Sequence, residues 1–561
     1  MDPKQLPPCD LVMKGGITSG VVYPGAVAAL AERYRFRRVG GSSAGAIAAA
    51  VCAAAEYGRQ TGRGPGMRVL TEIAQRLGEP GFLLGLFQPA PGARPLWEVA
   101  MALAERRAAE PGAHTRRLAL RAARMALTRR RKPLRPAGLA LIALAVALAG
   151  FGAAGALNPL ATVLLVLLGL VVVAALAAVA AVRALLELGR EALAALPDSD
   201  YGLCPGSRQP GGSGQALVEW LHERIQEAAG RTTDDPPLTF ADLEDEGIGL
   251  AMTTTDLSYA APVSVPLPAR TYMFHPDEMR ERFPGSVVEQ MMGSQEGPYP
   301  WMPDRDLPVV VGVRLSLSFP LLLSAMPLHA PRHEPAGVTR NLFSDGGICS
   351  NFPIHFFDAW FPRHPTFGID LVGDAGARPH LGDPERAEPP RWREVAGLGA
   401  FARQVKDAMQ NWRDAAQSQL PGFRDRVCRV PLAAGEGGLN LRMSPEQIST
   451  LIARGAEAGR LLRDDFDSDR HRFVRYLTLM QLLQRNIGAL GDPAAFADFA
   501  DELAAGVPGV DVFRAGGLHD ADWCRRAAAA TTDLTGWRPE VDLDGEGKPQ
   551  PVPDLRVVPP A

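Results

Sequence analysis

Three short glycine-rich stretches carry the residues that could perform chemistry. Residues 41–45 read GSSAG, a G-x-S-x-G pattern with Ser43 at its centre, and residues 14–20 read KGGITSG. Residues 344–347 read SDGG, which places Asp345 ahead of two glycines. A serine on a tight strand-to-helix turn can act as a nucleophile, and a glycine-rich loop can offer backbone N–H groups to an oxyanion. The pattern therefore predicts acyl transfer through Ser43.

The surrounding sequence predicts the elements that must position this serine. An apolar run at 11–13 and a run of alternating apolar and basic residues at 34–39 lead into the first two glycine stretches. Residues 24–32 and 44–57 are rich in small and apolar side chains, which favours buried helices. A β-α-β unit of this kind is right-handed and makes its two strands parallel. The glycine loop and Ser43 then lie at the same edge of the sheet, where ligand crevices form.

A nucleophilic serine needs a base, and Asp345 is the strongest candidate. The glycines after it suit a tight loop whose N–H groups would keep the carboxylate ionised against burial. An ordinary Asp-Gly-Gly turn is the alternative interpretation. A Ser-His-Asp triad that uses His329, His333 or His355 also stays open at this point.

Together, and in this order, the motifs resemble those of the patatin-like phospholipases. The resemblance covers about residues 10–60 and 215–465. It rests on matching segments from both halves of the chain, which are the loop 14–20 with Gly25, residues 41–45, residues 314–327, and Asp345, Gly346 and Gly347 with Asn351 and Pro353 behind them.

The resemblance implies an α/β fold with three layers, α/β/α, around a mostly parallel sheet. It implies a dyad in which Asp345 is the base for Ser43, with no catalytic histidine, no metal and no cofactor. The implied oxyanion hole consists of the backbone N–H groups of Gly15, Gly16 and Ala44. The implied reaction is hydrolysis of fatty-acyl esters of membrane phospholipids. The other motif glycines are Gly20, Gly41, Gly45, Gly346 and Gly347.

Two residues of the glycine loop depart from the family pattern. Ile17 stands where the family usually has a third glycine, and a β-branched residue does not easily adopt positive φ. Ser19 stands where the family has an arginine or lysine. These departures motivate a second hypothesis, a catalytically impaired lipid-binding scaffold in a membrane. A conventional hydrolase with a histidine triad is a third.

A long uncharged stretch predicts a membrane hairpin inside the catalytic domain. Residues 137–182 contain no charged side chain and divide at Asn158 into two runs, each long enough to span a bilayer. A buried helical hairpin is the alternative. Arginine and lysine crowd residues 116–135, which predicts cytoplasmic ends. We expect a protein of the bacterial inner membrane with two spans, whose catalytic domain faces the cytoplasm, and whose basic segment Arg116 to Arg135 contacts anionic headgroups.

Composition, apolar runs and a helix-capping pattern suggest how the rest of the chain is organised. The net charge of −3 argues against bulk nucleic-acid binding, and the sequence does not indicate an oligomeric state. Strands are predicted at 249–254, 309–317, 367–372 and 426–432, and a capped helix from Ser444. The apolar loop 81–87 is interpreted as core, with lipid contact as the alternative. The predicted units are residues 1–135 and 200–465 as the two parts of the catalytic domain, 136–183 as the hairpin, 466–538 as a helical region, and 539–561 as a disordered tail.

Overall fold

The computed structural model describes two main parts of the chain. These are residues 3–101, apart from 17, 95, 99 and 100, and residues 196–489, apart from 333–336, 360, 374–377, 385–391, 393, 434 and 439, with isolated positions between 167 and 194 and beyond 497. Within these residues, no helix combines the length and apolarity needed to cross a membrane. The basic segment, the tail and the predicted hairpin lie outside the described residues, apart from isolated hairpin positions between 167 and 179.

Nine of the described strands form one sheet, in the order β10-β11-β9-β1-β2-β4-β8-β7, with β5 paired to β4. The strands of this sheet are β1 (Pro8–Met13), β2 (Arg35–Ser42), β4 (Gly249–Asp256), β5 (Ala261–Val265), β7 (Met326–Arg332), β8 (Gly337–Asp345), β9 (Thr366–Gly373), β10 (His380–Leu381) and β11 (Val427–Leu432). A separate pair consists of β3 (Gly202–Cys204) and β6 (Leu321–Leu323).

The sheet is mixed, which corrects the prediction of a mostly parallel one. Strands β1, β2, β4, β9 and β11 are parallel to their neighbours in this group and form its centre. Strands β5, β7, β8 and β10 pair in antiparallel fashion. Short connections explain this part, because β4 to β5 and β7 to β8 are too closely spaced for a crossover helix.

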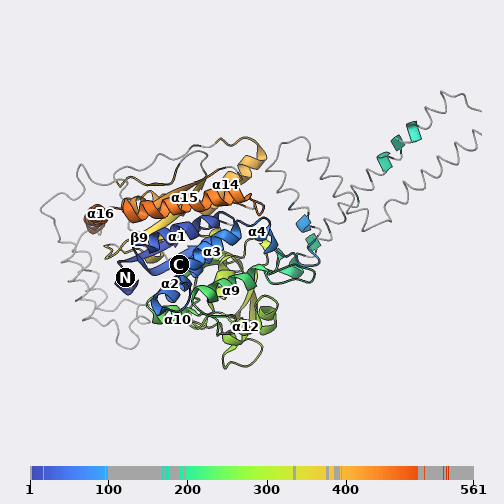
Figure 1. Cartoon of the computed structure of the whole chain (residues 1–561), viewed down its shortest axis with the longest axis horizontal. Helices are drawn as coiled ribbons and strands as arrows, with labels where there is room; N and C mark the ends of the chain where they lie inside the picture. The colour runs from blue at the N-terminus through green and yellow to red at the C-terminus, as the bar shows by residue number, and fades with distance from the viewer. Residues whose placement is uncertain are drawn as a thin grey trace, which may run out of the picture.

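Helices and the sheet are layered as Figure 1 shows, with α1 and α15 lying side by side across the blue and yellow strands. The α-helices are α1 (Tyr23–Ala31), α2 (Ala44–Thr61), α3 (Arg68–Leu77), α4 (Phe82–Gly85), α9 (Leu217–Ala228), α10 (Phe240–Asp245), α11 (Pro276–Arg280), α12 (Gly285–Met292), α13 (Val309–Ser316), α14 (Gly397–Ser418), α15 (Pro445–Asp464) and α16 (Ser468–Ala489). The predicted capping box of α15 is confirmed, since Ser444 and Gln447 cap each other.

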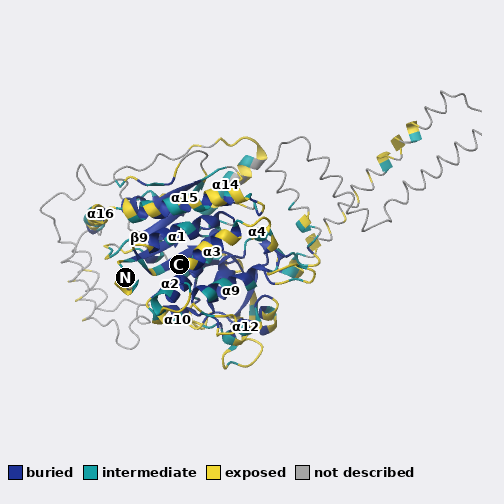
Figure 2. Ribbon diagram, in the orientation of Figure 1, coloured by how far each residue is buried: buried dark blue, intermediate teal, exposed yellow. Residues whose placement is uncertain are grey.

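Strand β1 shows how the core is divided between the two faces of the sheet. Leu11 and Met13 point into the main hydrophobic core, whereas Val12 between them joins a smaller cluster with Phe352 and Phe423. Successive side chains of a strand point to opposite faces, so a strand covered on both sides is apolar throughout. Figure 2 shows the resulting buried centre of the molecule.

One apolar run folds against the prediction. Residues 309–317 were expected to form a strand, but Val309–Ser316 is helix α13. All eight residues of this helix are buried. A segment buried on every side has no polar face, so its sequence shows neither the helical nor the strand period, and its β-branched valines favoured the wrong element.

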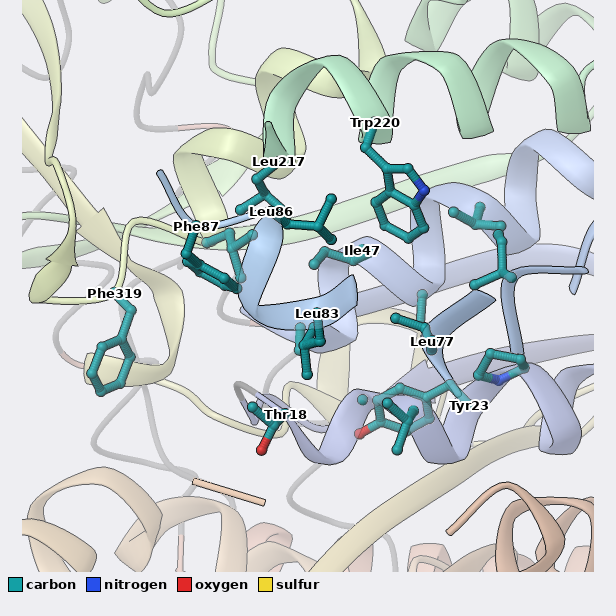
Figure 3. A pocket seen from close by; sticks show the side chains of 18 of the residues that line it. Thr18, Tyr23, Ile47, Leu77, Leu83, Leu86, Phe87, Leu217, Trp220 and Phe319 are labelled. Atoms are coloured by element: carbon teal, nitrogen blue, oxygen red, sulfur yellow. The ribbon is translucent and has the colours of Figure 1, made fainter. Parts of the chain in front are cut away.

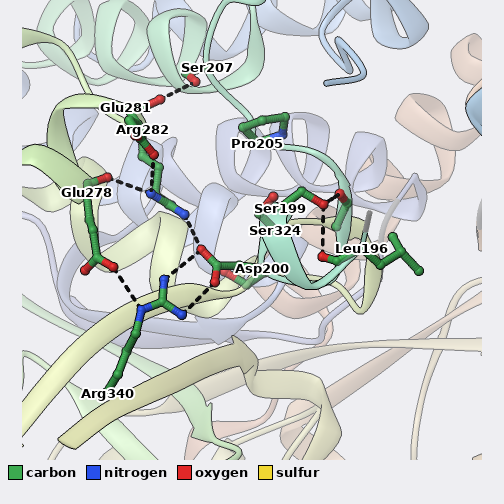
Figure 4. Close-up of polar contacts among 12 residues, drawn as sticks. Leu196, Ser199, Asp200, Pro205, Ser207, Glu278, Glu281, Arg282, Ser324 and Arg340 are labelled. Atoms are coloured by element: carbon green, nitrogen blue, oxygen red, sulfur yellow. Dashed lines mark hydrogen bonds and ion pairs between the residues drawn. The ribbon is translucent and has the colours of Figure 1, made fainter. Parts of the chain in front are cut away.

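An ion network around the buried Asp200 fixes the segment that leads into β3 (Figure 4). Asp200 accepts hydrogen bonds from Arg340 at 2.8 and 3.1 Å and also pairs with Arg282. Arg340 Nε in turn donates to Glu278 at 2.9 Å. Because burying a charge is costly unless it is paired, this network holds residues 196–204 against β8 and α11 in one arrangement.

Candidate active site

Ser43 lies on the turn between β2 and α2, as its sequence pattern predicts. Its φ of 56° and ψ of −127° lie in a region that residues with side chains seldom adopt. The side chain is 3% exposed. Backbone strain of this kind persists only when the surroundings enforce it, and here it presents the serine hydroxyl at the N-terminus of α2.

The glycines around this turn let three backbone segments approach one another. A Cβ on Gly41 would lie 2.4 Å from the backbone of Gly45, and a Cβ on Gly45 would lie 2.2 Å from the carbonyl oxygen of Met13. A Cβ on Gly346 would lie 1.9 Å from the carbonyl oxygen of Thr253. These distances leave no space for a side chain, so the motif glycines are required for the contact between β1, the serine turn and the Asp-Gly-Gly loop.

The pairing along β4 brings Asp345 to Ser43. Strand β5 occupies one side of β4, and β2 and β8 share the other side in succession. Ser42, the last residue of β2, lies opposite Thr253, and Asp345, the last residue of β8, lies opposite Thr254. The two strands run toward each other and end at adjacent residues of β4. The predicted base and nucleophile, three hundred residues apart in sequence, therefore meet at the same point of the sheet.

The surroundings of Asp345 favour a base with a raised affinity for a proton. Burial raises the pKa of its carboxyl to about 6, while the Ser43 hydroxyl, the Gly347 N–H and the charge of Lys406 act in the opposite direction. Oδ1 accepts the Gly347 N–H at 2.8 Å. Oδ2 is buried and has no partner with full hydrogen-bond geometry among the described residues. A general base works best with a pKa near the working pH, and this carboxyl is shifted in that direction.

The three predicted oxyanion donors are not equivalent. Gly15 N–H donates to the Asn351 carbonyl at 2.7 Å, so this donor is already engaged. Gly16 N–H and Ala44 N–H have no partner among the described residues. Ser19 packs against Gly16, where a Cβ would lie 2.3 Å from Ser19 Oγ. Of the three predicted donors, the N–H groups of Gly16 and Ala44 are therefore available to a ligand, whereas that of Gly15 is engaged. Ile17 lies outside the described residues.

Sequence reasoning missed two side chains that support the site. Ser316 Oγ accepts the Ser43 N–H at 3.0 Å and donates to the Thr253 carbonyl at 2.6 Å. It therefore links the strained turn at Ser43 to strand β4. Asn351 packs against Gly15 and Gly347, where a Cβ would lie 2.2 and 2.6 Å from its Oδ1. Both residues fall within the segments that carry the family resemblance, but nothing in their spacing marked them as partners of Ser43.

The histidines considered for a triad have other surroundings. His329 Nε2 lies 2.8 Å from Glu278, beside the ion network of Figure 4. His355 packs against the ring of Phe356. His333 lies outside the described residues. Among the described residues, the groups that act on the Asp345 carboxyl include no histidine, which fits a dyad of Ser43 and Asp345.

Comparison with known proteins identifies the family. A family model described as patatin-like phospholipase matches residues 11–139. The "RpoH suppressor" of Rhizobium meliloti (strain 1021) is 36% identical over 564 residues, which cover 85% of this chain and 86% of that protein. The chain belongs to the patatin-like phospholipase family.

Two solved structures resemble this patatin-like chain at a low level. VipD from Legionella pneumophila matches with a TM-score of 0.30 and 13% identity, covering 94% of this chain and 85% of that one. The type III effector protein ExoU matches with a TM-score of 0.24 and 15% identity, covering 95% and 71%. Similarities at this level carry no conclusion about the site.

An apolar cavity of about 90 Å³ adjoins the serine of this patatin-like domain. Its lining includes Ala44, the residue after Ser43, and Gly20 of the glycine-rich segment, and it extends between α1, α2, α4 and α9. Figure 3 shows Leu83, Phe87 and Trp220 pointing into it. The apolar loop at 81–87, interpreted from the sequence as core, thus lines a cavity beside the site. Its apolar lining suits the part of a hydrocarbon chain next to an ester at Ser43.

A wider polar cavity of about 750 Å³ adjoins the other side of the glycine loop. It is lined by Gly15 and Ser19, by the end of β9, and by the polar side of α14. Lys14 Nζ lies here, 2.6 Å from Asp370 Oδ1, and Lys406 lies on α14. A basic group is therefore present near the loop although Ser19 replaces the family's basic residue.

Proposed function

We propose that this chain is a membrane-anchored serine hydrolase that cleaves fatty-acyl esters of glycerophospholipids through Ser43 and Asp345. The observation that carries the proposal is the meeting of β2 and β8 on β4, which sets a strained serine beside a buried carboxylate whose pKa is about 6. Family membership supports hydrolysis of lipid esters as the general activity.

In the proposed reaction, Ser43 Oγ attacks the ester carbonyl while Asp345 accepts its proton. The N–H groups of Gly16 and Ala44 stabilise the negative charge that develops on the carbonyl oxygen. The ester bond then breaks, and the leaving lysolipid alcohol takes the proton from Asp345. Asp345 then takes a proton from water as the water oxygen attacks the acyl-enzyme. The bond between the acyl carbon and Ser43 Oγ breaks, the fatty acid leaves, and Asp345 returns the proton to Ser43 Oγ. No cofactor takes part in these steps.

The two cavities support a glycerolipid as the substrate. The acyl chain would enter the apolar cavity at Ala44, and the polar headgroup would lie in the cavity that holds Lys14 and Lys406. The ester between them would then lie against the glycine loop, next to Ser43. A short soluble ester would fill neither cavity and should be a poorer substrate.

Membrane anchoring is part of the proposal and rests on the uncharged stretch 137–182. The described positions of its second half include Leu167, Leu168, Val171 and Val172, all helical and all exposed. Exposed leucines and valines at successive positions around a helix fit contact with lipid. An even number of crossings keeps Ser43 and Asp345 on one side. We place that side in the cytoplasm of a bacterium, with residues 116–135 at anionic headgroups.

Covalent labelling tests the enzyme. A fluorophosphonate probe should label the wild-type protein, and Ser43→Ala should abolish both labelling and release of fatty acid from phospholipid. Ser42→Ala is the matched control, because it removes the neighbouring hydroxyl of the same turn. Labelling that persists in Ser43→Ala would refute the assignment, and lipid binding without fatty-acid release by the wild type would favour a scaffold.

Reporter fusions test the anchor separately. Alkaline phosphatase requires an oxidising compartment for its disulfides, so it should be active when inserted at Asn158 and inactive when fused near Pro197. Activity at both positions, or at neither, would contradict the two-span topology without affecting the catalytic assignment.

A further inference from the structure

Helix α14 packs with its polar side against the protein and turns its apolar side outward. Five large apolar side chains recur every three or four residues along it and are between 42% and 83% exposed, namely Leu398, Phe401, Val405, Met409 and Trp412. Surface helices normally bury such a stripe. Figure 2 shows exposed residues along α14, at the surface of the molecule.

The polar side of α14 is hydrogen-bonded to the backbone of the segment that follows Asp345. Asp414 is buried and accepts the backbone N–H groups of Asn351 and Phe352 at 2.8 and 2.7 Å. Asp407 and Gln410 line the polar cavity beside Gly15. The orientation of the helix is therefore set by hydrogen bonds to the segment that follows Asp345, which leaves the apolar stripe on the outer, solvent-exposed side of the helix.

From this arrangement we infer that the apolar stripe of α14 inserts into the interfacial layer of a phospholipid membrane and seats the active site on it. The inference rests on the proposed function for the nature of the substrate. The apolar side of α14 includes Phe401 and Trp412, and side chains of these two types favour the membrane interface. Trp392, which lies before the start of the helix, is 85% exposed and adds another aromatic side chain near the stripe.

The positive charge of Lys406, and its place between the apolar stripe and the polar cavity, favour a lipid layer over a protein as the partner of the stripe. Lys406 is exposed on α14, with its Nζ 5.8 Å from the ring centroid of Phe319, and it also lines the polar cavity. A cation at this position faces the phosphate groups of a lipid layer in which the stripe is immersed. The same helix then contacts neighbouring lipids through one side and the bound headgroup through the other.

The stripe can be tested with the full chain in vesicles of phosphatidylethanolamine and phosphatidylglycerol. Phe401→Asp with Met409→Asp should lower hydrolysis of vesicle phospholipid by about tenfold or more, because burial of one large apolar side chain already shifts an equilibrium by about that factor. Hydrolysis of a water-soluble short-chain ester by the same preparation should stay within about twofold. Phe473→Asp on α16, which lies to the left of α14 in Figure 1, changes a similarly exposed phenylalanine and is the matched control, so it should leave both rates unchanged.

A second measurement reports the position of the helix directly. Vesicles with brominated acyl chains should quench Trp412, and Trp412→Phe should remove that component while the stripe stays apolar. An unquenched Trp412, or full vesicle activity in the double variant, would overturn the inference and leave a second copy or another segment of the chain as the cover. Ser43→Ala should abolish hydrolysis but keep the quenching, so the failure of the proposed function and the failure of this inference are distinguishable.

Discussion

The buried carboxyl of Asp345 should make both activity and stability depend on pH in a defined way. Activity requires the ionised carboxylate, so kcat/KM should fall about tenfold for each pH unit below the pKa of about 6. The fold prefers the opposite form, because burial is the main cause of the raised pKa. Replacement by Asn, which stays neutral but keeps the shape and the oxygen that accepts the Gly347 N–H, separates the two effects.

The size of the effect follows from the two pKa values. A folded-state pKa of about 6, against an ordinary value of 3.8, corresponds to about 3 kcal/mol. The protonated carboxyl supplies this stability in full below pH 3.8, and it is lost as the pH rises through about 6. At about pH 8 the wild type should therefore unfold with a free energy up to about 3 kcal/mol lower than Asp345→Asn, and the difference should vanish near pH 4.

Two assays on the same pair of proteins check this reasoning. Thermal melts should give Asp345→Asn a Tm several degrees above the wild type at about pH 8 and an equal Tm near pH 4. Turnover of a soluble ester should be lost in Asp345→Asn at every pH. A variant that keeps turnover with the wild-type acid limb would indicate a histidine base, and a variant that melts below the wild type at about pH 8 would show that the carboxylate is stabilising.

Three further perturbations probe the surroundings of the dyad. Ser316→Ala removes the acceptor of the Ser43 N–H at 3.0 Å and should lower kcat about tenfold with KM unchanged; a rise in KM alone would contradict a positioning role. Gly15→Ala would place a Cβ 2.2 Å from Asn351 Oδ1 and 2.9 Å from the Ser42 carbonyl oxygen, so turnover should be lost, whereas Gly285→Ala, which meets nothing within 4 Å, should be silent. Asp200→Ala removes the buried partner of Arg282, which keeps an ion pair with the exposed Glu281 at 3.4 Å, and should destabilise the fold by about 3 kcal/mol in urea titrations, compared with less than about 1 for the exposed pair broken by Arg305→Ala.

The elements that carry Ser43 and Asp345 could be predicted because their residue types are compatible with few backbone conformations. Residues 41–45 combine a strand, small residues at a close approach and a helix start, and the structure shows that each of these glycines is packed against backbone. Asp345 was recognisable from the glycines after it, and the N–H of the second, Gly347, does contact its carboxylate. In both cases the local chain conformation leaves few alternatives, so the residue types are informative.

Contacts between distant segments were not predictable in the same way. Ser316 became visible as a partner of Ser43 only when α13 was placed, and α13 itself had been predicted as a strand because all of its residues are buried. The engagement of Gly15 N–H by the Asn351 carbonyl depends on where the loop after Asp345 lies. A single sequence records which residues are small or polar, but not which of the possible hydrogen-bond partners reaches them first.

The position of α14 links the chemistry to the state of the substrate. A phospholipid must leave its layer by only a short distance if the entrance of the site already lies at the headgroups, and the energy needed to extract its acyl chain is offset as the chain enters the apolar cavity at Ala44. The polar side of α14 and Lys14 line the cavity on the opposite side of the glycine loop, where the proposed function places the headgroup. Because Asp414 ties α14 to the backbone of Asn351, whose carbonyl holds Gly15, any tilt of the helix on the membrane would be transmitted to the oxyanion loop. Asp414→Asn should therefore lower turnover of the soluble ester as well as of vesicle lipid, whereas loss of the apolar stripe should affect the vesicle reaction alone.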